Sequence, residues 1–328
     1  MIIRNSIIKM KIICFGTPFF TSQIIRNISD DHEILCVVTT EDTQQGRGKR
    51  ILPSDVKKTA NELNIPLLQP KHLNDKEFIT DLINYNADLF LVVAFRKLPK
   101  DVWNIPRKGT INLHTSLLPQ YRGAGPINWV LINGENKTGL TTFFINDKID
   151  QGDIILQKEV CISENMTAGQ LHNQMIIDGS KLIIETLQLI DENRVTQKLQ
   201  SVENNFKNAP KIKKEFLKID WGKSLEDIHN KIRGLSPFID KNEMLKDVSI
   251  CPCAWFYLNN KRVKVQKSSI CNIVNRERYI DTDNKNYLNI NFKDRALSLE
   301  FLQIEGKKPM SIKQFLLGNK INSSDKIN

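Results

Sequence analysis

The chain lacks any apolar stretch that approaches the roughly 20 residues needed to span a bilayer as a helix. Its first ten residues, MIIRNSIIKM, also lack the long apolar core and the small-residue cleavage site of a signal peptide. We therefore expect a cytoplasmic protein with no membrane partner. Residues 1–9 are expected to form a short tail, and Met10 is an alternative start.

The six cysteines do not form a pattern typical of a metal site or a disulfide framework. Cys251 and Cys253 are separated by one residue, which is too close for the usual zinc pair, and no matching second pair follows. Other cysteines lie in apolar runs, where a reduced thiol behaves as a small apolar side chain. The sequence predicts a reducing compartment and no bound metal.

The chain also lacks a glycine-rich dinucleotide fingerprint. The first predicted strand, Lys11–Phe15, is followed by Gly16-Thr17-Pro18 rather than by the spaced glycines that cradle a pyrophosphate. This absence disfavours an oxidoreductase that binds a dinucleotide.

What the chain has is an ordinary globular composition and an uneven charge. Its 328 residues are 40% hydrophobic and 26% charged, and their number favours two domains. Residues 1–206 hold 23 basic and 23 acidic side chains, whereas residues 207–328 hold 24 and 14. A basic last third indicates a polyanionic partner, although a bias toward lysine and asparagine gives the same counts.

Strand-like and helix-like patterns alternate through the first part of the chain, which predicts a Rossmann-like, doubly wound and mostly parallel sheet. The predicted strands are Lys11–Phe15, Ile34–Thr39, Leu67-Leu68, Leu89–Ala94, Thr110–His114 and Gly139–Ile145. The predicted helices are Ser54–Leu63, 75–85, Pro126–Ile132 and Thr167–Ile190.

A second, smaller domain is expected after a polar stretch. A helix, Ser224–Gly234, precedes short alternating runs that predict a small OB-like β-barrel. These runs are Ala254–Leu258, Arg262–Gln266, Tyr287–Asn291 and Leu297–Ile304. The expected division is a catalytic domain over 10–194, a linker over 195–214, a basic barrel over 215–318 and a tail over 319–328.

The motif Asn112-Leu113-His114 carries the first sign of chemistry. Side chains alternate along a strand, so Asn112 and His114 share one face, where both could donate hydrogen bonds to one developing oxyanion. Taken alone, the motif is better explained by a capping asparagine and a buried structural histidine. The irregular loop that follows and the turn containing Asp150 favour a site, because ligands bind at the carboxyl edge of such sheets.

INLHTSLLPQYRGAGP followed by KIDQGD resembles the signature of the formyltransferases that use 10-formyltetrahydrofolate. The resemblance implies a formyl donor but no metal, and implies that Asn112, His114 and Asp150 are catalytic. It also places the folate-contacting loop at Ser116, Leu117, Leu118 and Pro119.

Further segments resemble the branch of this family that formylates methionyl-tRNA, over residues 10–318. GRGKR resembles the loop that reaches the acceptor arm of the initiator tRNA, which implies RNA contacts by Arg47, Lys49 and Arg50. By analogy we expect a monomer. The segment Ala94-Phe95-Arg96-Lys97 departs from the family, because many relatives carry Tyr-Gly here, beside the pterin pocket.

Three rival functions remain to be weighed. A formyltransferase acting on a purine-pathway amine is expected to be shorter and to lack the basic second domain. An amino-sugar formyltransferase commonly carries a large second catalytic domain that this sequence does not match. An RNA-binding protein without catalysis would not require the trio of Asn112, His114 and Asp150.

Overall fold

The computed structural model describes residues 10–45, 50–201, 205–241, 243–245, 250–272, 279–322 and 325–327. The described chain forms two compact units. One contains the chain up to Arg122 together with Gly139–Val160 and Gln174–Lys207, and the other contains Gly123–Thr138, Cys161–Asn173 and the chain from Asn208 onward. No helix among these residues is long and apolar enough to cross a membrane.

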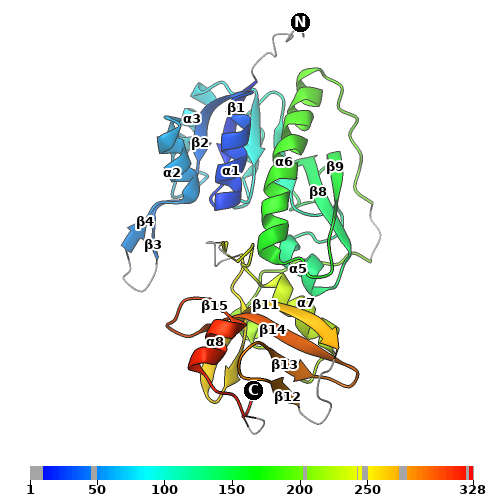
Figure 1. Cartoon of the computed structure of the whole chain (residues 1–328). Coiled ribbons are helices and arrows are strands. Elements are labelled where there is room, and N and C mark those ends of the chain that lie inside the picture. The colour runs from blue at the N-terminus through cyan, green and yellow to red at the C-terminus, as the bar shows by residue number, and fades with distance from the viewer. Residues whose placement is uncertain are drawn as a thin grey trace, which may run out of the picture. The chain divides into compact units, whose positions relative to one another are not determined.

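The first sheet has seven strands in the order β5-β2-β1-β6-β7-β8-β9. Figure 1 labels β1, β2, β8 and β9 of this sheet. Neighbours from β5 to β7 are parallel, and β8 runs antiparallel to β7. The strands are β1 (Lys11–Phe15), β2 (Glu33–Val38), β5 (Leu67–Leu68), β6 (Leu89–Val92), β7 (Thr110–His114), β8 (Lys137–Phe144) and β9 (Ile154–Cys161). The mostly parallel α/β sheet predicted from the sequence is confirmed.

Helices lie beside the sheet, as Figure 1 shows for α1, α2, α3 and α6. They are α1 (Phe19–Ile28), α2 (Asp55–Glu62), α3 (Lys76–Asn84), α4 (Lys100–Trp103) and α6 (Ala168–Asp191). The central strands are apolar throughout, as Leu89–Val92 shows, because both faces of a doubly wound sheet are covered. The first strand leads into α1 through Gly16, where a Cβ atom would lie 2.7 Å from the Val93 carbonyl oxygen.

A small hairpin extends from the first unit beyond α2 (Figure 1). It consists of β3 (Thr43–Gln45) and β4 (Arg50–Leu52), which pair antiparallel with each other. The residues between these strands lie outside the described part of the chain. The resemblance implied an RNA-contacting loop around GRGKR, and the structure shows that Thr43–Gln45 and Arg50–Leu52 on either side are paired strands.

The second unit is built on an antiparallel sheet in the order β10-β11-β14-β13-β12, with β15 beside β14. Its strands are β10 (Ala254–Leu258), β11 (Lys261–Asn272), β12 (Ile280–Thr282), β13 (Leu288–Asn291), β14 (Arg295–Ile304) and β15 (Met310–Ser311). No ladder joins β10 to β12 among the described residues, so the expected barrel is an open sheet here. Its helices are α5 (Pro126–Ile132), η1 (Lys214–Leu217), α7 (Leu225–Gly234) and α8 (Ile312–Gly318).

Apolar side chains of α7, α8 and the five strands β10 to β14 form one core in this second unit. The α7 helix begins at Ser224, whose hydroxyl accepts a hydrogen bond from the Asp227 backbone N–H at 3.1 Å. The α5 helix, which begins at Pro126 as predicted, is joined to this unit by the Asn128 side chain, which donates to the Gly234 and Ile250 carbonyls.

Candidate active site

The site begins on β7, the last parallel strand of the first sheet. Leu113 points toward α6, because a Cβ atom on Gly179 of that helix would lie 2.9 Å from the Leu113 side chain. Alternation along the strand therefore directs Asn112 and His114 to the opposite face. Asn112 is half-buried and its side-chain amide has no hydrogen-bond partner among the described residues. The strand thus presents an amide that is available to a ligand.

His114 is buried, and one of its ring nitrogens is held by the main chain. Its Nε2 atom lies 2.9 Å from the Tyr121 carbonyl oxygen. Since a carbonyl oxygen only accepts, Nε2 carries the hydrogen in this contact. The other ring nitrogen, Nδ1, has no partner in the part of the chain that the structure describes. The imidazole is therefore oriented through one nitrogen and has the second available for a ligand.

The loop after β7 is fastened to β8 through the Thr141 hydroxyl. This hydroxyl donates to the Ser116 carbonyl at 2.7 Å and accepts from the Leu118 backbone N–H at 3.1 Å. The Gln157 amide adds a bond to the Leu118 carbonyl at 2.9 Å. Thr141 is directly opposite His114 in the strand register. The loop and the histidine are thus positioned by the same pair of strands.

The side chains of the predicted folate loop have unequal exposure. Ser116 is fully buried and its hydroxyl donates to the Gln120 carbonyl at 2.6 Å. Leu118 packs in a small cluster with Phe143 and Ile154. Leu117 and Pro119 are half-buried, and the Leu118–Pro119 peptide bond is cis. Two of the four predicted side chains therefore stabilise the loop itself.

Asp150 lies in a turn between β8 and β9, with a positive φ of 54°. Its carbonyl oxygen accepts from Arg122 Nε at 3.0 Å and from Gln200 Nε2 at 3.0 Å. Gln200 also accepts from the guanidinium of Arg122 at 2.5 Å. Burial lowers the pKa of Arg122, while the nearby Asp150 charge raises it. Arg122 and Gln200 therefore position the turn that carries the predicted catalytic carboxylate.

Gly152 in this turn is required by packing. A Cβ atom at this position would lie 1.6 Å from the Phe144 carbonyl oxygen, so any larger residue must displace the main chain.

An open pocket of about 540 Å³ adjoins the Asp150 turn. The residues that line it come from the turn and from two other segments of the same unit: Arg122, Asn146, Asp147, Lys148, Gln151, Asp153, Leu199, Gln200, Ser201 and Phe206. The Arg122 guanidinium lies over the Phe206 ring at 5.6 Å. The described residues include no cluster of three His, Cys, Asp or Glu side chains that could hold a metal ion.

The structure links the neighbourhoods of the predicted catalytic residues. Asn112 and His114 share one face of β7, Tyr121 accepts from His114, and the adjacent Arg122 donates to Asp150. The sequence reasoning missed Arg122 and Gln200. Arg122 lies inside the quoted signature and was a detectable signal, whereas Gln200 lies 50 residues from Asp150 in a polar stretch.

Of the three residues predicted to contact RNA, the structure describes only Arg50. Arg47 and Lys49 lie outside the described residues, and Arg50 is described only as part of strand β4. At the segment that departs from the family, Ala94 has a positive φ of 49°, and the exposed Arg96 donates to the Pro70 and Lys71 carbonyls. Arg96 thus ties the end of β6 to the chain after β5.

Two family patterns match the chain. The Formyl transferase family covers residues 9–187, and the Formyl transferase C-terminal domain family covers residues 211–320. The chain is 41% identical over 325 residues to a methionyl-tRNA formyltransferase of Flavobacterium johnsoniae, covering 97% of this chain and 99% of that one. It is 40% identical over 319 residues to the methionyl-tRNA formyltransferase of Clostridioides difficile, covering 96% and 98%.

Solved structures share the fold at lower identity. A crystal structure of WlaRD, a sugar 3N-formyl transferase, in the presence of dTDP and 5-N-formyl-THF aligns with a TM-score of 0.61 and 22% identity, covering 91% of this chain and 99% of that one. An N-formyltransferase from Helicobacter canadensis in complex with folinic acid and dTDP-3-aminofucose aligns with a TM-score of 0.59 and 21% identity, covering 88% and 98%.

Proposed function

Because the chain belongs to the methionyl-tRNA formyltransferase family, we propose that it transfers a formyl group from 10-formyltetrahydrofolate to the α-amine of methionyl initiator tRNA. The products are N-formylmethionyl-tRNA, which starts translation, and tetrahydrofolate. The observation that most directly supports a role in this reaction lies on one face of β7. There the Asn112 amide and the His114 Nδ1 atom, which donates a hydrogen bond once the ring is protonated, have no partner among the described residues.

The Asn112 amide and the His114 ring stabilise the oxyanion that develops when the amine attacks the formyl carbon. Both groups present N–H donors at the carboxyl edge of a parallel sheet, where a ligand of an α/β fold binds. The Tyr121 carbonyl fixes the orientation of the ring through Nε2, so Nδ1 is the nitrogen that faces the reacting carbonyl once the ring is protonated.

Asp150 supports the positive form of the imidazole and, through a water molecule, accepts the proton that leaves the amine. A carboxylate near an imidazole favours the protonated ring and serves as a proton acceptor. Arg122 and Gln200 restrain the Asp150 turn through its carbonyl oxygen, so the carboxylate is presented from a fixed backbone.

The folate carrier is held by the loop at Ser116, Leu117, Leu118 and Pro119. Since Ser116 and Leu118 are buried, their contribution is to shape the loop, and the half-buried Leu117 and Pro119 supply the apolar contact surface. The folate-containing structures named above have the same fold, which makes such a carrier compatible with this sheet edge.

The tRNA is bound by two regions of positive charge. Arg47, Lys49 and Arg50 of the hairpin contact the acceptor arm, and the basic residues after position 206 bind backbone phosphates. The proposed division assigns the chemistry to residues 10–194, the linker to 195–214 and RNA binding to 215–318. We further propose that the protein acts as a monomer in the cytoplasm, where initiator tRNA is charged.

The test supplies formyl-folate with one of three acceptors: methionyl initiator tRNA, methionyl elongator tRNA or an amino-sugar nucleotide. The proposal predicts formylation of the initiator tRNA at a rate well above that of the elongator. Transfer to the amino sugar alone would contradict it and assign the chain to another acceptor.

A further inference from the structure

Three polar side chains form a closed cluster beside the hairpin of β3 and β4. Lys57 Nζ donates to Asp42 Oδ2 at 2.8 Å and to Gln69 Oε1 at 2.9 Å. The Gln69 amide donates to Asp42 Oδ1 at 2.9 Å and to the Thr40 carbonyl at 2.7 Å. Hydrogen bonds from Lys57 and then from Gln69 lower the pKa of Asp42. The cluster is therefore a bonded unit in which each member contacts the other two.

The members of this cluster come from the two ends of the hairpin and from the adjacent strand. Asp42 immediately precedes β3, Lys57 lies in the first turn of α2 just after β4, and Gln69 follows β5. A second link joins the same two ends, because the Thr39 and Ser54 hydroxyls lie 2.9 Å apart. The chain entering the hairpin and the chain leaving it are thus fastened together at the hairpin base.

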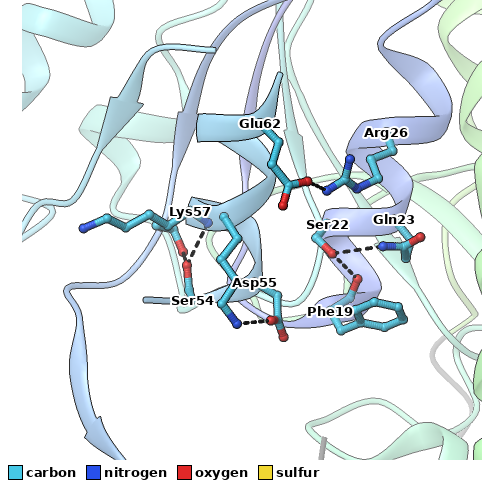
Figure 2. A network of polar contacts seen from close by, with 10 residues as sticks. Phe19, Ser22, Gln23, Arg26, Ser54, Asp55, Lys57 and Glu62 are labelled. Carbon is cyan, nitrogen blue, oxygen red and sulfur yellow. Dashed lines mark hydrogen bonds and ion pairs between the residues drawn. The ribbon is translucent and has the colours of Figure 1, made fainter. Parts of the chain in front are cut away.

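Ser54 connects this base to the start of α2. Its hydroxyl accepts from the Lys57 backbone N–H at 3.0 Å, as Figure 2 shows, and this caps the helix. Figure 2 also shows that the Lys57 side chain extends from the side of α2 that faces away from α1. On the side that faces α1, an ion pair between Arg26 and Glu62 joins the two helices. The base of the hairpin is therefore connected to α2, and α2 is in turn joined to α1.

The hairpin has little apolar burial of its own to fix its direction. Ile51 and Leu52 on β4 are 67% and 43% exposed. A two-stranded hairpin is marginal in water unless it packs against something else. The hydrogen-bonded cluster at its base can therefore contribute to how the hairpin projects from the sheet.

We propose that Asp42, Lys57 and Gln69 are positioning residues that hold the β3–β4 hairpin in the orientation required to engage methionyl-tRNA. This inference rests on the role of the hairpin given under Proposed function. A lysine beside an RNA-binding hairpin would ordinarily be expected to contact an RNA phosphate. Here its ammonium is bonded to a carboxylate and an amide, and the Lys57 and Asp42 side chains are only 25% and 28% exposed. Lys57 thus acts on RNA through the hairpin and not by contact.

The test compares Lys57→Met with Lys58→Met. Lys58 is the next residue on the same helix, and its ammonium pairs with Asp55 at 2.8 Å in an exposed ion pair of the kind that contributes little to stability. Each substitution removes one positive charge, so the general attraction for RNA changes equally. Lys57→Met is expected to raise the KM for methionyl-tRNA about tenfold, since it breaks charge-assisted hydrogen bonds at the base. The kcat and the KM for formyl-folate are expected to stay unchanged. Lys58→Met is expected to leave all three constants within about twofold.

A conservative variant and a melting measurement separate positioning from folding. Asp42→Asn keeps an oxygen acceptor for Lys57 and is expected to raise the KM for methionyl-tRNA less than Lys57→Met does. Thermal unfolding of each variant is followed in parallel. A general loss of kcat with all substrates, accompanied by a large drop in melting temperature, would show a merely structural cluster and overturn the inference.

The double variant with Arg47→Ala distinguishes failure of the inference from failure of the proposed function. If the cluster acts by orienting the hairpin, Lys57→Met should raise the KM for methionyl-tRNA little further once Arg47 is removed, because both substitutions impair the same RNA contact. An Arg47→Ala variant with normal tRNA kinetics overturns the hairpin role and the inference with it. If Arg47→Ala raises the KM for methionyl-tRNA while Lys57→Met and Lys58→Met have equal KM values, the inference is overturned but the proposed role of the hairpin is not.

Discussion

The catalytic edge of the first sheet and the β3–β4 hairpin are held in different ways. At the catalytic edge, buried or partly buried hydrogen bonds join β7, β8, the loop after β7 and the Asp150 turn. The hairpin is joined to its neighbours by hydrogen bonds at its base, and its apolar side chains Ile51 and Leu52 are exposed. Chemistry requires donors fixed to fractions of an ångström, whereas an arm that meets a large RNA requires only a direction. Changes in the two regions should therefore affect different kinetic constants.

The largest effect is expected from Asn112→Ala and His114→Ala. Removing one donor to a developing oxyanion lowers kcat by about 10²–10³-fold. Both variants should retain the wild-type KM for methionyl-tRNA, because neither side chain belongs to the hairpin. Steady-state formylation with both substrates varied checks this. A kcat within threefold of wild type in either variant would remove the residue from the catalytic set.

The next effect concerns salt. Three phosphate contacts by Arg47, Lys49 and Arg50 alone should weaken tRNA binding roughly 20- to 40-fold when the salt is raised from 50 to 200 mM, and contacts by the basic residues after position 206 add to this loss. The single-turnover rate at saturating tRNA should change little, since the catalytic donors are neutral or buried. Filter binding and rapid-quench assays in the two buffers measure the two quantities. An equal salt dependence of tRNA binding and of the single-turnover rate would contradict the separate roles of the hairpin and the catalytic edge.

A smaller effect is expected from Arg122→Met. The substitution removes the donors that hold the Asp150 carbonyl and Gln200, and charged hydrogen bonds of this kind contribute about 1.5–3 kcal/mol each. We expect kcat to fall about tenfold because the Asp150 turn is released. The matched control is Arg194→Met, which removes an arginine from an exposed ion pair with Glu192. Equal activity of the two variants would show that Arg122 does not position Asp150.

The smallest effect concerns thiols in the packed interiors. Burial raises the pKa of the Cys36 thiol to about 12 and that of Cys253 to about 11. These two thiols should therefore stay protonated and unreactive in the native protein, whereas the exposed Cys161 should be labelled quickly. Mass spectrometry after brief alkylation locates the label, and Cys161→Ser should keep activity within about twofold. Rapid native labelling of Cys36 would contradict its packing.

Sequence periodicity was sufficient for the long apolar strands and the capped helices. Thr110–His114 is a strand as predicted, and the predicted strand Leu89–Ala94 is found over Leu89–Val92. Ser54 and Ser224 cap the helices that follow them. Periodicity did not find α1, β9 or β3. The α1 segment follows a short turn without a side-chain cap, and β3 is a three-residue strand, too short to show an alternating pattern.

The site was predictable where chemistry lies within one motif and not where the fold brings distant residues together. Asn112 and His114 are two residues apart, so strand geometry alone places them on one face. The bonds from Gln200 to the Asp150 turn and from Gln69 to Asp42 join residues 50 and 27 positions apart. No local pattern encodes such contacts, because they depend on how the strands are ordered in the sheet.

The most direct test measures the chemical step alone in Asn112→Ala and Lys57→Met, in single turnovers with both substrates saturating. The account predicts that Asn112→Ala slows formyl transfer by about 100-fold or more, while Lys57→Met transfers at the wild-type rate once enough tRNA is supplied. Equal slowing in the two variants, or full speed in Asn112→Ala, would contradict it.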